Sequence, residues 1–342
     1  MAKVRMQDVA AHAGVSTRTV SNVVNDYVHV SPAMRERVQR SLDELGYKMD
    51  YVARGLKSGR TGFIALAVPT LAGPYFGELA EAVVHAAAGR SLTVLVEVTG
   101  GDLETELRIV RGGLTNLADG VLLSALALPL NSDDQPPPDF PLVLLGEHRP
   151  GRNLDQVCID NIAAARTAVQ HLIEGGYRRI AIIGADIGET GRLRYEGYRQ
   201  ALAEAGIAPP EALPLQLRDG NRAGGMAVVE SMFSARMLVP DAIFAFNDEV
   251  AIGAMRGLSA HGLRVPDDVA VIGIDNIVED AYTTPPLSSV APDLPALAER
   301  ALDLLDEQSQ RQLQPRAPRQ EFTSFRLVVR DSSRPPETGT SP

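Results

Sequence analysis

The sequence predicts a small all-α head followed by a larger α/β body, in which two lobes each contain a parallel sheet. The N-terminal residues carry helical periodicity broken by a turn glycine. From Thr61 onward, apolar runs of strand length alternate with helical stretches, which is typical of βαβ units. The alternation restarts after Asp160 with a second set of similar size, which indicates two similar lobes.

We expect four regions along the 342 residues: a head over 1–48, a linker over 49–60, a two-lobed body over 61–331 and a disordered, Pro-rich tail over 332–342. The first lobe should comprise about 61–160 plus part of 290–331, and the second about 161–289.

The head is predicted to contain three helices, over 6–13, 17–25 and from Ser31-Pro32 to Gly46. Ser16 and Ser31 precede the second and third helices as capping residues, and Pro32 occupies a first helical position. In the third helix, apolar side chains recur at helical spacing, at Met34, Val38, Leu42 and Leu45.

The segment MQDVAAHAGVSTRTVSNVVN fits a helix-turn-helix motif. Ala10 allows two helices to approach closely, and Gly14 supplies the turn. The residues expected to bury the inner faces are Val9, Val15, Val20 and Val23. That leaves short or forked polar side chains on the outer face of the second helix, at Thr17, Arg18, Ser21 and Asn22. Such side chains suit base edges in a major groove, whereas a generic helical hairpin is the alternative.

In the body, the predicted strands are FIALAVP, LTVLVEV, DGVLLSA, LVLLGEH, RIAIIGA, DAIFAFN and VAVIGID. The predicted helices are an Ala-rich stretch ending near Gly89 and helices around 104–117, 161–174, 191–205 and 248–261.

The net charge of −10 alone argues against a nucleic-acid partner, but the charges are unevenly distributed. Residues 1–60 hold ten Lys or Arg and six Asp or Glu, whereas the remaining residues hold 23 and 37. A basic head on an acidic body suits a protein that contacts phosphates at one end only. The single cysteine, Cys158, and the absence of a recognisable signal peptide or membrane span favour the cytoplasm.

The chain resembles the lactose/galactose repressor (LacI/GalR) family of bacterial transcriptional regulators. The resemblance rests on VSTRTVSNVVN and HVSPAMRERVQRSLDELGY in the head, and on GRTGFIALAVP, GLRVPDDVAVIGIDN and TTPPLSS in the body. It implies a sensor body similar to periplasmic sugar-binding proteins. It also implies a homodimer that binds a pseudo-palindromic operator and responds to a small-molecule effector. No leucine heptads follow the body, so we expect a dimer and not a coiled-coil tetramer.

In the head, the resemblance implies that Thr17, Arg18 and Asn22 read bases. It assigns phosphate contacts to a further set of polar residues, Ser16, Thr19, Ser21, Asn25 and His29. For His29, an ordinary surface histidine stays an open alternative.

In this family the linker forms a hinge helix on DNA, and paired leucines wedge into the minor groove. Leu56 matches the wedge position, with Ala53 and Arg54 beside it. Met49-Asp50 and Gly55 depart from the family pattern, and glycine costs a helix about 0.5–1 kcal/mol relative to alanine. We therefore expect a hinge that is less helical without DNA than in most relatives.

In the body, the resemblance implies effector contacts between the lobes, at the ends of strands, by Tyr75, Phe76, Glu147, Arg194, Asn247, Asp248 and Asp275. A forked arginine with carboxylates suits a sugar, because each group can bind two adjacent hydroxyls; a purine or another metabolite is the alternative. Structural roles also stay open: an ion pair between the lobes for Arg194 and Asp275, helix capping for Asn247 and Asp248, and core packing for the aromatic side chains.

Other classes of function fit the sequence less well. It contains no P-loop, no GxSxG nucleophile elbow and no HExxH zinc pair, so we expect no enzyme, metal or other cofactor. A periplasmic binding protein would need a secretion signal and would not need residues 1–60. A constitutive architectural DNA-binding protein would not need the large body.

Overall fold

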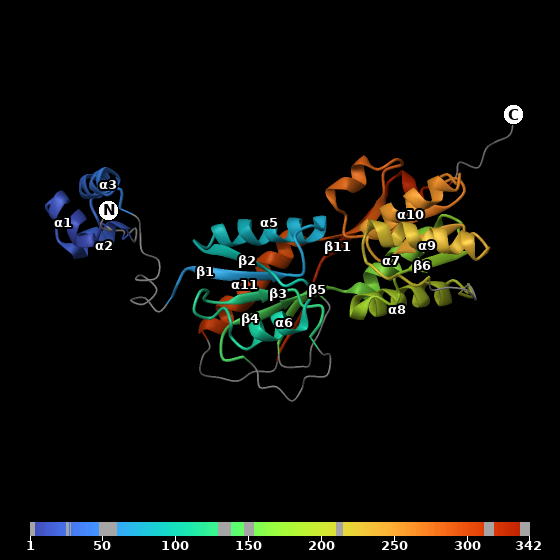
Figure 1. The fold of residues 1–342 in the computed structure, drawn as a ribbon, viewed down its shortest axis with the longest axis horizontal. Coiled ribbons are helices and arrows are strands. Elements are labelled where there is room, and N and C mark those ends of the chain that lie inside the picture. Colours follow the sequence, from blue (N-terminus) through green and yellow to red (C-terminus); the bar gives the residue numbers. More distant parts are fainter. Residues whose placement is uncertain are drawn as a thin grey trace. The chain divides into compact units, whose positions relative to one another are not determined.

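The computed structural model describes residues 4–24, 27, 29–47, 60–128, 138–146, 154–209, 215–310 and 318–335. The chain divides into two compact units, with the boundary between Thr61 and Gly62. In Figure 1 the smaller unit is helical, and the larger one contains two sheets flanked by helices.

The described part of the small unit contains the three expected helices, α1 (Met6–Ala13), α2 (Thr17–Val24) and α3 (Pro32–Leu45). Gly14 ends α1 with φ of 62°, a left-handed conformation that favours glycine, and a Cβ at this position would lie 2.6 Å from Arg37 Nη2. Ser31 caps α3 by accepting a hydrogen bond from the Met34 amide at 3.4 Å. The helices enclose one apolar core, made by Val9, Ala10, Ala13, Val20, Val23, Val38 and Leu42.

The first lobe of the large unit contains a parallel sheet of six described strands in the order β10-β5-β4-β3-β1-β2. Its strands are β1 (Phe63–Val68), β2 (Thr93–Val98), β3 (Val121–Leu123), β4 (Leu142–Leu145), β5 (Asp155–Ile159) and β10 (Gln320–Thr323). Helices α5 (Pro74–Ala88) and α11 (Leu294–Gln310) pack on one face, and α6 (Leu103–Val110) packs on the other. Because both faces are covered, the central strands β1, β3 and β4 are continuous apolar runs.

The second lobe contains five described strands in the order β11-β9-β8-β7-β6. They are β6 (Ile180–Ile183), β7 (Ala242–Ala245), β8 (Ala270–Ile274), β9 (Ser288–Pro292) and β11 (Phe325–Val328). All are parallel except β11, which runs antiparallel to β9. Helices α7 (Asn161–Glu174) and α8 (Gly188–Glu204) cover one face, and α9 (Arg222–Ser234) and α10 (Asp248–Ala260) cover the other. Two short 3-10 helices, η1 (Val278–Tyr282) and η2 (Asp331–Ser333), complete the described elements.

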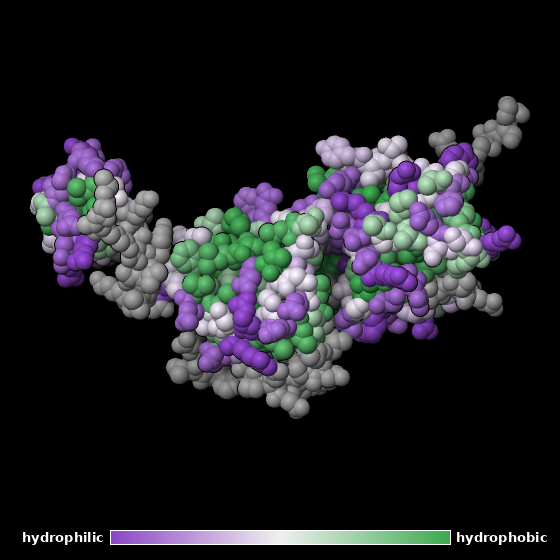
Figure 2. All heavy atoms as spheres, in the orientation of Figure 1, coloured by the Kyte–Doolittle hydropathy of each residue, from purple (hydrophilic) through white to green (hydrophobic). Residues whose placement is uncertain are grey.

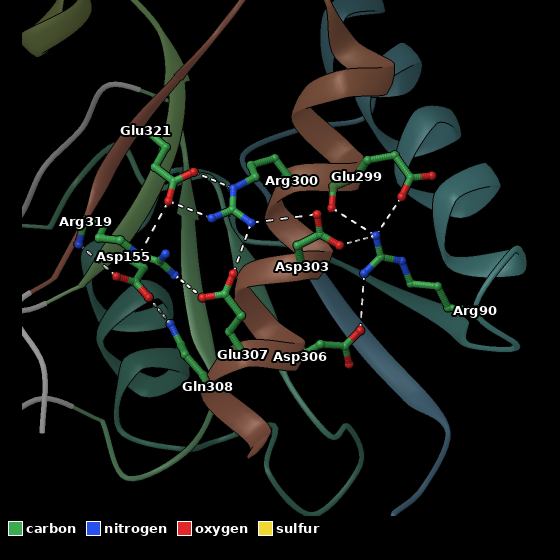
Figure 3. Close-up of polar contacts among 10 residues, drawn as sticks. All are labelled: Arg90, Asp155, Glu299, Arg300, Asp303, Asp306, Glu307, Gln308, Arg319 and Glu321. Carbon is green, nitrogen blue, oxygen red and sulfur yellow. Dashed lines mark hydrogen bonds and ion pairs between the residues drawn. The ribbon is translucent and has the colours of Figure 1, made fainter. Parts of the chain in front are cut away.

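A network of ion pairs fixes α11 to the sheet of the first lobe (Figure 3). Arg300 donates to Glu321 of β10 at 2.7 Å and to Glu307 at 3.2 Å, and Arg319 donates to Glu307 at 2.5 Å. Arg90, just beyond α5, contacts three acidic side chains along α11 at 2.6–3.2 Å, those of Glu299, Asp303 and Asp306. The network thus joins elements from the end of the chain to a sheet made mostly by its first half.

The expected helix over 104–117 is too long. It ends at Val110, because Gly112 adopts φ of 90° and turns the chain out of the helix.

The predicted disordered tail, residues 332–342, is wrong for its first residues. Ser332 and Ser333 are fully buried in η2. Ser332 Oγ accepts a hydrogen bond from the Ser288 amide at 2.8 Å, and Ser333 Oγ lies 2.8 Å from His171 Nε2. Short hydroxyl side chains therefore satisfy buried polar groups here, although the same composition is typical of disordered tails. Residues 336–342 lie outside the described part of the chain.

Candidate functional site

The outer face of α2 presents the polar side chains predicted to contact DNA. Thr17 and Arg18 are exposed in the first turn, and Ser21 and Asn22 are half-buried one turn later. The opposite face is fixed because Val20 and other apolar side chains lie in the core of the head. The α2 backbone is therefore held rigidly beneath the side chains that are predicted to read bases.

Two further residues hold the ends of α2. The Ser16 hydroxyl accepts a hydrogen bond from the Thr19 amide at 3.1 Å, so the predicted cap is confirmed, and it lies 2.9 Å from the Thr19 hydroxyl. At the other end, Arg35 of α3 donates to the Val23 carbonyl at 3.5 Å and to the Tyr27 carbonyl at 3.1 Å. The sequence pattern predicts no role for Arg35, because an exposed-looking helical arginine carries no signal of its distant partners.

His29 is exposed, and its ring contacts that of Tyr27 edge-on with centroids 5.3 Å apart. This surface position is compatible with both interpretations of His29. Five predicted site residues lie outside the described part of the chain, namely Asn25, Ala53, Arg54, Leu56 and Glu147. The linker residues that depart from the family pattern, Met49, Asp50 and Gly55, also lie outside it.

In the second lobe, a polar cluster forms around the buried Arg194 of α8. Its Nε donates to Asn161 Oδ1 at 2.7 Å, and its Nη1 donates to the Phe246 carbonyl. The guanidinium carbon lies 5.1 Å from the centroid of the Phe246 ring, a cation–π contact. Nη2 lies 3.9 Å from Asp275 Oδ1. That last separation is too long for a hydrogen bond, so a ligand hydroxyl can be shared between the two groups.

The ion pair between Arg194 and Asp275 lies within one lobe. The alternative of a pair between lobes is therefore wrong, because α8 and the end of β8 both belong to the second lobe. Asp275 and Asn276 have φ of 128° and 55°, in the left-handed region that non-glycine residues rarely occupy. Strained backbone of this kind concentrates at ligand sites, where the surrounding contacts hold it.

Asn247 caps α10, as one of its two interpretations predicted. Its Oδ1 accepts from the Val250 amide at 2.8 Å, and its Nδ2 donates to the Gly220 carbonyl at 3.1 Å. Asp248, the next residue, is fully buried and accepts hydrogen bonds from the Asn276 amide at 2.5 Å and the Ser289 hydroxyl at 2.7 Å. The Asp248 carboxyl thus lies beneath the turn that carries Asp275, a buried position that fits neither the predicted effector contact nor the alternative of capping α10.

The first lobe contributes the start of α5. Tyr75 and Phe76 are half-buried, pack against the core of that lobe and contact each other edge-on at 5.2 Å. One turn later, Glu78 reaches the second lobe and accepts a hydrogen bond from the Val278 amide at 3.0 Å. Burial raises the pKa of Glu78, and Glu279 and Asp248 raise it further. Glu78, Asn161 and Phe246 were not predicted, because only the fold brings them to this place.

Within the described ranges, no helix has the length and apolar character needed to cross a membrane. The same residues contain no cluster of three or more His, Cys, Asp or Glu side chains arranged to hold a metal ion.

The chain is similar to known regulators along most of its length. A model described as "Bacterial regulatory proteins, lacI family" matches residues 5–50, and one described as "Periplasmic binding protein-like domain" matches residues 169–333. The ribose operon repressor of Escherichia coli (strain K12) is 33% identical over 303 residues, which cover 88% of this chain and 91% of that protein.

Solved structures of such regulators are also similar to this chain along most of its length. The Lac repressor dimer bound to operator and the anti-inducer ONPF has a TM-score of 0.81 at 27% identity, covering 97% of this chain and 99% of that chain. A complex of the transcriptional regulator CelR with cellobiose has a TM-score of 0.69 at 32% identity, covering 96% and 99%.

Proposed function

This chain belongs to the LacI family of bacterial regulatory proteins, and from that premise we propose that it represses transcription as a homodimer bound to a pseudo-palindromic operator. It is a DNA-binding regulator with a small-molecule effector and not an enzyme. An effector bound to the body changes the affinity of the heads for the operator. Coupling of this kind is typically about 1–3 kcal/mol, enough to change operator occupancy severalfold or more.

The observation that carries this proposal is the exposed polar face of α2 on a head fixed by its own core. The guanidinium of Arg18 suits the O6 and N7 acceptors of guanine, and the amide of Asn22 suits adenine. Thr17 is the third base-reading residue. Phosphate contacts by Ser16, Thr19, Ser21, Asn25 and His29 set the register, and Leu56, flanked by Ala53 and Arg54, wedges into the minor groove.

Selection of binding sites from random duplex DNA tests this proposal and needs no operator of defined sequence. The wild-type protein should enrich a pseudo-palindrome. Arg18→Ala should relax the preference at one base pair of each half-site, a loss of about 1–3 kcal/mol of discrimination. Arg40→Ala, which removes an exposed arginine paired with Glu36 on α3, is the matched control and should keep the full preference. An unchanged preference in Arg18→Ala would rule out the base-reading role.

For the effector, we propose a sugar or a sugar derivative bound by Arg194, Asp275 and Asn247, with Tyr75 and Phe76 on the opposite lobe and Glu147 as a further contact. The 3.9 Å between Arg194 Nη2 and Asp275 Oδ1 supports this choice, since one hydroxyl can accept from the first and donate to the second. A purine acting as corepressor is the alternative.

The homodimer is proposed to form on the side of the first lobe that carries β2 and α5. Several apolar side chains are exposed there, those of Val84, Leu95, Val96 and Val98. Figure 2 shows apolar side chains gathered over this lobe. Because β2 is the edge strand among the described strands of this sheet, pairing of two copies would cover both the apolar side chains and that edge.

A further inference from the structure

Asp248 is a fully buried acid that supports the backbone of the proposed effector site. Its Oδ2 accepts hydrogen bonds from the Asn276 amide at 2.5 Å, the Ile277 amide at 3.4 Å and the Ser289 hydroxyl at 2.7 Å. The two amides directly follow Asp275. The carboxyl thus holds the strained turn that presents Asp275 to a ligand.

The Asp248 carboxyl occupies the space that a side chain at Gly273 would need. A Cβ at that position would lie 2.0 Å from Asp248 Oδ1, so any larger residue would displace the acid. Oδ1 itself has no hydrogen-bond partner among the described residues. One oxygen of Asp248 therefore holds the turn, while the other needs a donor.

The side chain that interacts with the Asp248 carboxyl and can supply that donor is Asp280 of η1. It is fully buried, and neither of its carboxyl oxygens has a hydrogen-bond partner within the described residues. Arg330 Nη1 lies 3.8 Å from Asp280 Oδ2, and Arg330 Nη2 donates to Asn276 Oδ1 at 2.8 Å. Burial and the adjacent Asp248 raise the pKa of Asp280 to about 10, while Arg330 opposes this rise and Asp275 adds to it.

From this geometry we propose that Asp248 and Asp280 share a proton, and that this buried acid pair positions the Asp275–Asn276 turn of the effector site. The proton lies between the two carboxyls, with Asp280 as the donor and Asp248 as the acceptor. Asp248 and Asp280 are then positioning residues and do not touch the effector. Glu78, Glu279 and Arg330 are the other charged groups around the pair and its turn. The inference rests on the proposed role of Asp275 in effector binding.

Infrared spectroscopy of the full-length protein tests the shared proton without any effector. The wild-type protein at pH 7 should show a carbonyl band of a buried protonated carboxyl. Asp280→Asn should remove that band, because the asparagine amide then donates to Asp248 in place of the protonated acid and Asp248 stays ionised. Asp268→Asn is the matched control at a carboxyl that Arg264 keeps ionised, where hydrogen bonds lower the pKa, and it should leave the band unchanged. Absence of the band from the wild-type protein would overturn the proposal.

Hydrogen exchange at the Asn276 and Ile277 amides tests the positioning role. Asp280→Asn retains an N–H donor toward Asp248, so protection of these amides should stay within about twofold of wild type. Asp280→Leu has a similar size but no donor, and protection should fall at least about tenfold at the turn while β6 stays protected. Equal protection in the two variants would contradict the proposal. Because no effector is used, failure here is distinct from failure of the proposed sugar site.

Discussion

At the scale of single residues, Asp275 gives the sharpest test of the effector cluster. Asp275→Ala should bind operator normally and lose at least about tenfold in effector affinity, since a hydrogen bond to a charged group contributes about 1.5–3 kcal/mol. Thermal shift against a panel of free sugars, including ribose and cellobiose, and of purine nucleosides measures the effect. Asp268→Ala, on an exposed carboxylate, should respond as wild type. A normal response in Asp275→Ala would place the effector elsewhere.

Capping residues were predictable from sequence because their partners lie within four residues. Ser16, Ser31 and Asn247 all cap helices as their local pattern indicates. By contrast, Asp248 and Asp275 each follow a strand and look equivalent in sequence. The packing of η1 and Gly273 buries Asp248, whereas Asp275 lies beside Arg194. These contacts arise from the fold and have no local signal in the sequence.

At the scale of elements, the ion pairs in Figure 3 hold α11 against the sheet of the first lobe and should contribute to stability. Arg300→Met should destabilise the protein by about 1–2 kcal/mol, because exposed ion pairs contribute up to about 1 kcal/mol each and Arg300 contacts both Glu307 and Glu321. Urea unfolding measures the loss. Arg264→Met removes an arginine from exposed pairs with Asp267 and Asp268 and should change stability by less than about 0.5 kcal/mol.

The same variant has an expected pH dependence. Hydrogen bonds from Arg319 and Arg300 lower the pKa of Glu307 from its ordinary value of 4.5, and the hydrogen bond from Arg300 lowers that of Glu321 from the same value. A depressed pKa stabilises the folded state above the unfolded value, and this contribution is lost as pH falls through the folded value. The destabilisation by Arg300→Met should therefore be largest near pH 7 and shrink below pH 4.5. A destabilisation that is the same at pH 7 and at pH 3 would contradict the assigned role of these pairs.

Most elements of the large unit were predicted from local patterns, but helices α9 and α11 and strands β5, β9, β10 and β11 were not. The head helices and seven of the strands follow directly from apolar periodicity. The four-residue strands β10 and β11 carry little local signal. Their partners, β5 and β9, lie far away in the sequence, so only the assembled sheets identify them.

At the scale of the whole large unit, the chain crosses between the lobes at several described points. It passes from β5 to α7, returns from β9 to α11, and crosses again from β10 to β11. The segment between β9 and α11 is hydrogen-bonded to the segment between β10 and β11. The Asp293 amide donates to the Ser324 carbonyl at 3.0 Å, and the Ser324 hydroxyl donates to Asp293 Oδ2 at 3.1 Å. Glu78 adds a separate hydrogen bond between the lobes. A change in the angle between the lobes must therefore bend these hydrogen-bonded connecting segments and alter the contact between Glu78 and Val278.

In the proposed dimer, two heads on one pseudo-palindrome bind far more tightly than one head alone. Val98→Asp places a charge on the apolar β2 edge, where Val98 is 52% exposed, and should convert the dimer to a monomer in sedimentation equilibrium. Operator affinity should fall by about 10²–10⁴-fold, since the second head no longer binds at high effective concentration. Leu238→Asp makes a similar change at a leucine that is 80% exposed on the second lobe, and both dimer and affinity should persist. If Val98→Asp stays dimeric, the two copies must associate through another face, and the exposed apolar side chains of β2 need a different partner.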